Sequence, residues 1–310
     1  MIYAIGAFDG FHTGHCELLK TARRTAEAEN CRWGVLTFDR NPQQFLSGGN
    51  FKQLFTDAER DFYAKLLNIP EFVKIPFTKE LAGLAPDEFM RLMKEKYEAC
   101  GIVVGEDFRF GAGRRGDALF IRDYCAENNM AFSSVKTLEF NGGTVSSTRI
   151  RKLVCEGKIK TANELLGLPY YVSGEVVTGE QRGRLIGFPT ANLLPEDGKV
   201  YPKNGSYFTI TLVENELYPS VTNIGFNPTF DGKKLICETH LPNFAKDIYG
   251  KKITVFFAEE NRGEMKFESS EKLAEQLRAD TQKSAAVLKG FMKDNTALLD
   301  NIKAQALTWL

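Results

Sequence analysis

Along the first 150 residues, short apolar runs alternate with amphipathic segments that carry polar residues on one side. The apolar runs have the length and composition of buried strands and lie at residues 2–6, 31–38, 71–75, 101–105 and 131–135. The segments between them have helical spacing and lie at residues 16–29, 57–67, 86–97 and 117–129. Thr56 and Glu59 form a capping box at the start of the second helix. Strands that alternate with helices of this length predict an α/β domain with a parallel sheet covered on both faces.

The pattern changes after about residue 166. Short segments rich in β-formers and separated by Gly, Pro and Asn lie at residues 170–178, 207–213, 217–222, 235–241 and 252–259. This spacing predicts a small antiparallel barrel, and a helical region follows it from Ser270 to Ala306. Residues 149–167 read as two short helices that end at Gly167. We therefore expect two domains of different class, at residues 1–152 and 168–310, with a connector at residues 153–167.

The composition is that of an ordinary globular protein, with 43% hydrophobic and 26% charged residues. Forty basic and forty acidic residues cancel, so no net field attracts nucleic acid or anionic lipid. The sequence has neither a leader pattern at its start nor an apolar stretch of membrane-spanning length. Six scattered cysteines, with no CxxC spacing, are typical of reduced thiols rather than of structural zinc. We expect a cytoplasmic protein without a nucleic-acid or membrane partner.

Two of the three histidines, His12 and His15, flank Gly14 where the first strand turns into a helix. Such a turn exposes backbone N–H groups at the positive end of the helix dipole, which suits a phosphate. The alternative is a glycine-rich connection with two solvated histidines. The HxGH pattern resembles the signature of the nucleotidylyltransferase superfamily. The candidate ATP-binding residues of this stretch are Gly6, Phe8, Asp9, Gly10, His12, Gly14 and His15.

Two further N-terminal segments are candidates for anion binding. Residues 105–116 contain glycine-rich turns with arginines, for which a solvated loop is an equally good interpretation. The sequence SSTRIR begins a helix after a loop. The hydroxyls of Ser147 and Thr148 either cap that helix or, together with Arg151, hold the β- and γ-phosphates of ATP.

The second half of the chain has a basic glycine loop that leads into the sequence GFPTAN. In extended structure Thr190 and Asn192 point to the same face, and their oxygens are hard neutral ligands suited to Mg²⁺ together with phosphate. The alternative for this pair is a turn with a local hydrogen bond. Glu238, in an alternating strand, is either a general base or a residue on a solvated face.

Taken together, these segments resemble the bifunctional bacterial riboflavin kinase/FMN adenylyltransferase family, also called FAD synthetase. The resemblance covers nearly the whole chain, in the family's order. It is carried by GAFDGFHTGH, PFTKELAGLAPDEF, VVGEDFRFG, GRRGD, SSTRIR, GRLIGFPTANL, NGSYF, TNIGFNPTF, CETHLPNF, DIYGKKITVFF and KFES.

This resemblance implies two ATP-dependent steps, from riboflavin to FMN and from FMN to FAD with release of pyrophosphate. In the N-terminal domain, the residues that bind the ATP phosphates would be His12, His15, Ser147, Thr148 and Arg151. In the C-terminal domain, Thr190 and Asn192 would hold Mg²⁺–ATP beside Gly187 and Pro189. Glu238 would accept the proton of the ribityl 5′-hydroxyl.

The chain departs from the family at two positions near the expected adenylyltransferase site. Ala7 stands where the family usually has asparagine, and Asn41 stands where it usually has histidine before a proline. Each change removes polar groups, so we expect slower or differently selective adenylylation and intact phosphorylation. A riboflavin kinase with a weakened second site and a flavin-binding regulator are the alternatives. The sequence leaves open the relative rates, the flavin redox preference, the oligomeric state and channelling between the sites.

Overall fold

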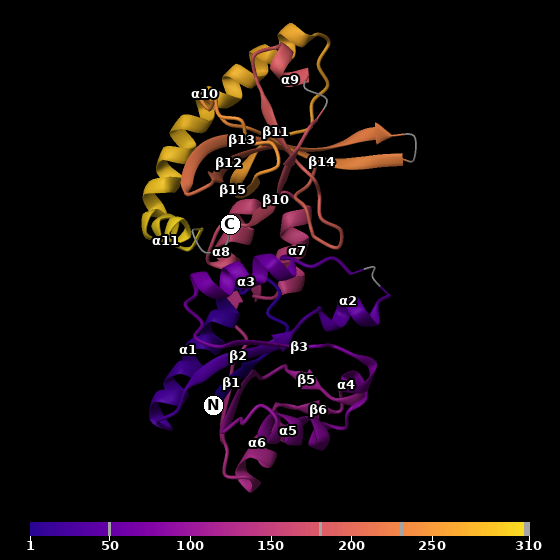
Figure 1. Ribbon diagram of the computed structural model, residues 1–310, viewed down its shortest axis with the longest axis vertical. Helices are drawn as coiled ribbons and strands as arrows, with labels where there is room; N and C mark the ends of the chain where they lie inside the picture. The colour runs from indigo at the N-terminus through magenta and orange to yellow at the C-terminus, as the bar shows by residue number, and fades with distance from the viewer. Residues whose placement is uncertain (49–50, 180–181, 230–231, 307–310) are drawn as a thin grey trace. The chain divides into compact units, whose positions relative to one another are not determined.

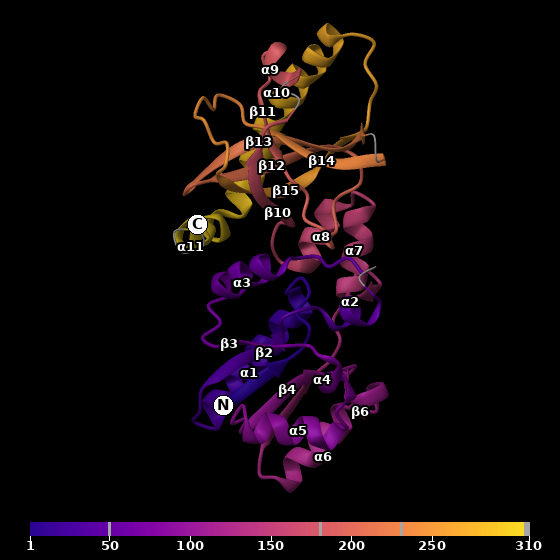
Figure 2. The same ribbon diagram turned by 45° about the vertical axis from the view of Figure 1, so that its right-hand side comes forward.

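The computed structural model describes residues 1–48, 51–179, 182–229 and 232–306. The chain divides into two compact units, Met1–Arg149 and Ile150–Leu310 (Figures 1 and 2). The first is an α/β unit with a parallel sheet, and the second is an antiparallel barrel followed by terminal helices. Both fold classes predicted from the sequence are thereby confirmed.

The N-terminal unit is built on five parallel strands in the order β3-β2-β1-β4-β7. These strands are β1 (Ile2–Ile5), β2 (Trp33–Phe38), β3 (Phe72–Ile75), β4 (Gly101–Gly105) and β7 (Ala131–Val135). All five lie where the apolar runs predict them. The chain proceeds from β1 outward through β2 and β3, then crosses to the other side of β1 for β4. The carboxyl end of β1 therefore lies at the switch point of the sheet, the usual place for a ligand in such folds.

Helices cover both faces of this sheet. The four predicted from periodicity are present as α1 (Thr13–Ala28), α3 (Asp57–Leu66), α5 (Pro86–Glu95) and α6 (Ala118–Glu127). Alternation along β1 directs Tyr3 and Ile5 into the core that α5 and α6 share. The opposite face packs against α1, which contacts β1, β2, β4 and β7.

Several short elements escape the sequence pattern because they hold too few residues to show a period. They are α2 (Pro42–Leu46), α4 (Lys79–Gly83), the 3₁₀ turn η1 (Ala112–Arg114), and two small hairpins, β5 (Arg109–Phe110) with β6 (Gly116–Asp117) and β8 (Glu139–Phe140) with β9 (Gly143–Thr144).

The C-terminal unit is a closed barrel of six strands in the order β10-β11-β14-β13-β12-β15, with neighbours antiparallel. They are β10 (Tyr171–Val177), β11 (Thr190–Leu193), β12 (Gly205–Val213), β13 (Glu216–Thr229), β14 (Gly232–His240) and β15 (Lys252–Gly263). The sequence pattern predicts five of them and misses β11, which has four residues. This short strand pairs with both β10 and β14 and so closes the barrel.

Helices precede and follow the barrel. Those before it are α7 (Ser147–Cys155) and α8 (Ile159–Leu166), and those after it are α10 (Ser270–Asp294) and α11 (Thr296–Ala306). The short helix α9 (Arg182–Leu185) lies between β10 and β11. The two short helices predicted before the barrel are present as α7 and α8, and Gly167 ends α8 in the left-handed conformation. The long helix α10 packs along β12, β13 and β15 (Figure 1).

The interior of the barrel is partly polar. Five fully buried hydroxyl side chains from β12, β13 and β14 bond to one another at 2.7–3.4 Å. They belong to Thr209, Thr211, Ser220, Thr222 and Thr239. Their mutual hydrogen bonds offset the cost of removing these hydroxyls from water.

Candidate functional site

The HxGH histidines lie at the start of α1 and contact each other. His12 is the N-cap of the helix, and its Nδ1 accepts a hydrogen bond from the backbone N–H of His15 at 3.3 Å. The two rings stack with their centroids 3.7 Å apart and their planes 15° apart. A Cβ atom on Gly14 would lie 3.1 Å from that Nδ1, so a glycine relieves crowding against the His12 ring. Because the imidazole acts as a cap, α1 begins three residues earlier than the apolar spacing predicts.

Burial keeps both imidazoles neutral near pH 7. It lowers the pKa of His12 to about 4. Burial, together with the neighbouring His12, lowers the pKa of His15 well below 6.5. In addition, the buried Nδ1 of His15 has no hydrogen-bond partner among the residues that the structure describes. An anion placed against this pair would raise both pKa values, because it favours the charged form of each ring.

The loop between β1 and α1 is held in an unusual backbone conformation. Phe8 and Phe11 have φ of 47° and 41°, and Gly10 has φ of 95°. Left-handed backbone is costly for a bulky residue such as phenylalanine, and strained conformations of this kind cluster at functional sites. Both phenylalanine rings are fully buried and stack at 5.3 Å, which supports this conformation. The half-buried Gly6 precedes the loop, and a Cβ on it would lie 3.2 Å from the Phe8 ring.

Hydrogen bonds bring the start of α7 to this loop. The Ser147 hydroxyl donates to the backbone carbonyl of Asp9 at 2.7 Å. The carboxylate of Asp9 accepts from the backbone N–H of Leu54 at 2.8 Å. The structure thus brings Ser147 beside the HxGH loop, although the two are far apart in sequence.

The two serine hydroxyls of the SSTRIR segment have different hydrogen-bond partners. The hydroxyl of Ser146 accepts from the backbone N–H of Arg149 at 3.3 Å. It is therefore Ser146, rather than Ser147, whose hydroxyl bonds a free backbone N–H group at the start of the helix. Thr148 follows Ser147 in the first turn of α7. Arg151 lies one turn further along the same helix, beyond the division between the units at Arg149.

Both positions that depart from the family pattern make defined contacts. The Ala7 carbonyl accepts from the Thr37 hydroxyl at 3.3 Å and from an Arg60 Nη at 3.2 Å. Asn41 is buried and caps α2, with its Oδ1 accepting from the Gln43 N–H at 2.9 Å. The side chain of Asn41 is therefore also part of the local fold.

In the barrel, strand pairing assembles the second group of residues. Thr190 lies opposite His240, and Asn192 lies opposite Glu238, where β11 pairs with β14. Glu238 is in turn opposite Asn223 on β13. Since neighbouring pairs on one strand alternate between faces, these side chains share the outer face of the barrel, whereas Thr239 points inward to the buried hydroxyls.

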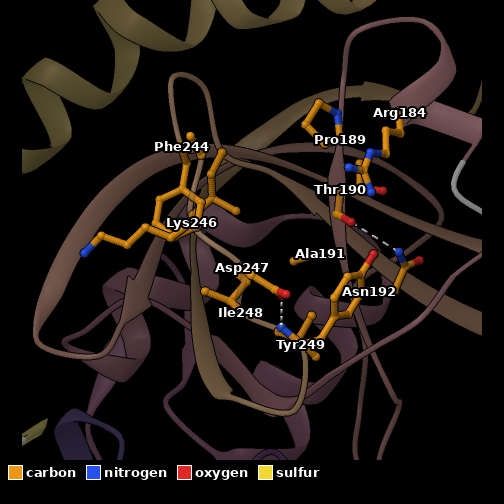
Figure 3. A pocket seen from close by; sticks show the side chains of 13 residues that line it. Arg184, Pro189, Thr190, Ala191, Asn192, Phe244, Lys246, Asp247, Ile248 and Tyr249 are labelled. Carbon is orange, nitrogen blue, oxygen red and sulfur yellow. Dashed lines mark hydrogen bonds between the residues drawn. The ribbon is translucent and has the colours of Figure 1, made fainter.

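Two cavities of about 330 Å³ each lie on this face, and Thr190 lines both. The first, named the polar cavity for Arg184, Asn192, Lys246, Asp247 and Tyr249, also has apolar side chains in its wall, among them Phe244 and Ile248 (Figure 3). Figure 3 shows Asn192 beside Thr190, with the Asn192 Nδ2 donating to the Thr190 carbonyl at 3.4 Å. The Asp247 carboxylate accepts from the Tyr249 backbone N–H at 3.0 Å, and the Lys246 amine points away from Thr190.

The second cavity has a mixed lining, in which charged residues such as Arg262 and Glu264 stand beside a group of apolar side chains. Its walls include Ile186, Phe188, Phe226, Ile236, Met265 and Phe267. The half-buried Glu238 contributes a carboxylate to this wall, near the junction with the first cavity at Thr190. A planar aromatic molecule with a polar tail fits such a lining, because the tail then reaches the carboxylate and the polar cavity.

The segment between α9 and β11 carries the other candidate residues of the kinase loop. Gly187 is exposed, with φ of 83°, and Pro189 lines the polar cavity. The carbonyl of Pro189 lies 2.8 Å from the Nδ1 of His240. Burial lowers the pKa of His240, while this hydrogen bond partly opposes the shift.

The donor groups here fit a Mg²⁺ ion only together with a phosphorylated ligand. Thr190 and Asn192 are neutral oxygen ligands on one face of β11, at the rim of the polar cavity. No cluster of three His, Cys, Asp or Glu side chains suited to a metal ion occurs in the described ranges. Mg²⁺ is commonly bound through a few protein oxygens plus substrate phosphates, and this pair matches that pattern.

The motifs alone assign no role to several residues at these cavities. Arg184, Asp247, Asn223 and His240 all lie within quoted motifs, but their places follow from strand register and from loops. The signal that points to His240 is its spacing of two residues from Glu238 in a strand, which puts both on one face.

Family models match most of the chain. The model for FAD synthetase matches residues 1–149, and the model for riboflavin kinase matches residues 166–288. The bifunctional riboflavin kinase/FMN adenylyltransferase of Listeria monocytogenes is 32% identical over 288 residues, covering 92% of this chain and 91% of its own length. The Escherichia coli K12 protein of the same name is 33% identical over 282 residues, covering 90% of each chain.

A solved structure has a closely similar fold. A crystal structure from Streptococcus pneumoniae, described as a macrolide-efflux protein, matches with a TM-score of 0.85 and 32% identity. The match covers 92% of this chain and 93% of that chain. No helix in the described part of this chain combines the length and apolar composition that a membrane crossing requires.

Proposed function

This chain belongs to the bifunctional riboflavin kinase/FMN adenylyltransferase family, and on that basis we propose that it converts riboflavin to FMN and FMN to FAD, using ATP in both steps. The observation that carries the proposal is the pair of cavities that share Thr190, the second of which has Glu238 and a group of apolar side chains in its wall. We further propose that residues 1–152 perform adenylylation and residues 168–310 perform phosphorylation, with residues 153–167 as the connector.

For the kinase step, the second cavity takes the flavin ring against its apolar side chains, and the polar cavity takes ATP. The carboxylate of Glu238 accepts the proton of the ribityl 5′-hydroxyl as that oxygen attacks the γ-phosphorus, and ADP leaves. Thr190, which lines both cavities, lies between donor and acceptor and would hold Mg²⁺–ATP together with Asn192. When bound there, Mg²⁺ would neutralise charge on the phosphates.

For the adenylyl step, a phosphate oxygen of FMN attacks the α-phosphorus of ATP, and pyrophosphate leaves. The attacking oxygen is already ionised near pH 7, so no general base is needed and orientation is the main task. His12 and His15 are held neutral by burial and offer N–H donors to the phosphates, while the start of α7 supplies Ser147 and Thr148. Arg151 would add a positive charge.

The reactants place the protein in the compartment that holds ATP and riboflavin, and we propose the cytoplasm. The six cysteines carry free thiols, in keeping with a reducing compartment. Its small-molecule partners would be riboflavin, FMN and ATP.

One assay tests the whole proposal. The full-length chain is incubated with riboflavin, ATP and Mg²⁺, and riboflavin, FMN and FAD are separated by chromatography over time. The expected result is FMN followed by FAD, with both reactions dependent on ATP. A chain that binds riboflavin but forms no FMN would be a flavin-binding regulator, and a chain that stops at FMN would be a kinase with an inactive N-terminal site.

A further inference from the structure

His240 is the one histidine outside HxGH, and it connects two strands of the proposed kinase site. Its Nδ1 lies 2.8 Å from the carbonyl oxygen of Pro189, and its ring packs 5.2 Å from that of Phe188. A carbonyl oxygen only accepts, so the Nδ1 of His240 carries the proton and donates. In the barrel register His240 lies directly opposite Thr190, the residue that lines both cavities.

The segment that leads into Thr190 has internal hydrogen bonds, and Thr190 itself is paired with β14, opposite His240. The backbone N–H groups of Ile186 and Phe188 both donate to the Gly183 carbonyl, at 3.2 and 2.8 Å. These two bonds lie within the turn, and the pairing of β11 with β14 begins only at Thr190. The bond from His240 extends the connection to β14 by one peptide group, to the Pro189 carbonyl.

The position of this bond matters because of the planarity of the peptide group. The Pro189 carbonyl and the Thr190 N and Cα belong to one rigid plane. A donor that fixes the orientation of this carbonyl therefore also fixes the positions of the Thr190 N and Cα atoms, and with them the point from which the Thr190 side chain starts. We propose that His240 is a positioning residue for the kinase step, which holds the Pro189 carbonyl through its Nδ1–H and thereby fixes Thr190 between the two cavities. This role rests on the proposed function of the barrel.

Two matched substitutions separate the hydrogen bond from simple packing. His240→Phe keeps an aromatic ring against Phe188 but has no donor. His240→Asn loses the ring but places an N–H donor three bonds from Cα, as the Nδ1 of histidine is. The kcat of FMN formation is measured for the full-length chain with saturating riboflavin, ATP and Mg²⁺, and FAD formation from FMN is measured in the same preparations.

We expect His240→Phe to lower the kcat of FMN formation about tenfold, the size expected for the loss of one such hydrogen bond. His240→Asn should retain most of the wild-type kcat because it restores the donor, and FAD formation from FMN should be unchanged in both. An Asn variant as slow as the Phe variant, or a Phe variant with wild-type kcat, would overturn the positioning role. A wild-type chain that forms no FMN would overturn the kinase proposal itself, and the role of His240 with it.

Discussion

His12 and His15 meet because they stand in one turn of α1, whereas Asn192 and Glu238 meet because β11 pairs with β14. The first group is a local motif, held by a strained loop and by the buried surroundings of the rings. The second group forms only when the barrel closes, and closure depends on β11, the strand that the sequence pattern does not predict. Short spacing along the chain is therefore enough to find the histidine site, whereas the barrel site can be found only once the register of the strands is known.

The two sites also differ in the charges of their side chains. Burial keeps the N-terminal imidazoles neutral, so that site relies on hydrogen-bond donors and on the charge that a ligand brings. The barrel site presents a half-buried carboxylate, Glu238, to the second cavity and places Arg184 at the polar cavity. Proton acceptance is thus expected only in the barrel, and the two activities should respond separately to substitution.

The largest effect is expected at the barrel carboxylate. Glu238→Gln should lower FMN formation by on the order of 10²–10⁴-fold, because a neutral amide cannot accept the hydroxyl proton. FAD formation from FMN should survive, since we propose that it takes place in the other unit. Glu214→Gln, which removes an exposed carboxylate paired with Lys251 at 2.6 Å, is the matched control and should leave both rates unchanged. Near wild-type kinase activity in Glu238→Gln would show that Glu238 is not the general base but an ordinary residue on a solvated face of the strand.

The reciprocal substitutions address the N-terminal site. His12→Ala or His15→Ala should lower FAD formation about 10²-fold, as for the loss of one preorganised donor, and leave riboflavin phosphorylation nearly unchanged. His12→Asn is the sharper variant, because asparagine is a good N-cap and so preserves the start of α1 while removing the imidazole. Loss of both activities together would indicate unfolding, which a circular dichroism melt detects.

Acid should destabilise the N-terminal unit through the same histidines. His12 titrates at about 4 when folded and near 6.5 when unfolded, so between these pH values the unfolded chain binds more protons. The free energy of unfolding should therefore fall as the pH is lowered from 6.5 toward 4, by about 3 kcal/mol for His12 alone.

Trp33 on β2 reports this unfolding by its fluorescence in urea, in a Trp309→Phe background that removes the other tryptophan. His12→Asn should flatten the dependence on pH, since it removes a titrating group. An equally steep dependence in that variant would mean that groups other than His12 set the acid sensitivity.

The smallest effect is expected at the two departures from the family pattern. If Ala7 and Asn41 weaken the N-terminal site, FMN should accumulate before FAD appears, and Ala7→Asn with Asn41→His should speed FAD formation several-fold. Because Asn41 caps α2, Asn41→His alone should also cost about 1 kcal/mol in stability, a cost that Asn41→Asp avoids. A time course with saturating FMN and ATP measures the rates, and an unchanged rate in the double variant would show that the departures are neutral.

The order of elements in both units follows from local patterns in the sequence. Apolar runs spaced by amphipathic segments carry the α/β pattern, and the capping box at Thr56 is present, with each partner bonded to the other. HxGH was also visible, because its chemistry lies within one helical turn. These are local properties, and local spacing records them directly.

Which distant residues share a face depends on how the strands pair in the folded barrel. No pattern in the sequence pairs Thr190 with His240, or shows that one residue lines two cavities, because register depends on how the whole barrel closes. The same holds for the buried hydroxyls around Thr222, which resemble ordinary surface threonines until the strands place them inside. The neutrality of His12 and His15 is likewise a consequence of burial, which packing sets and spacing does not.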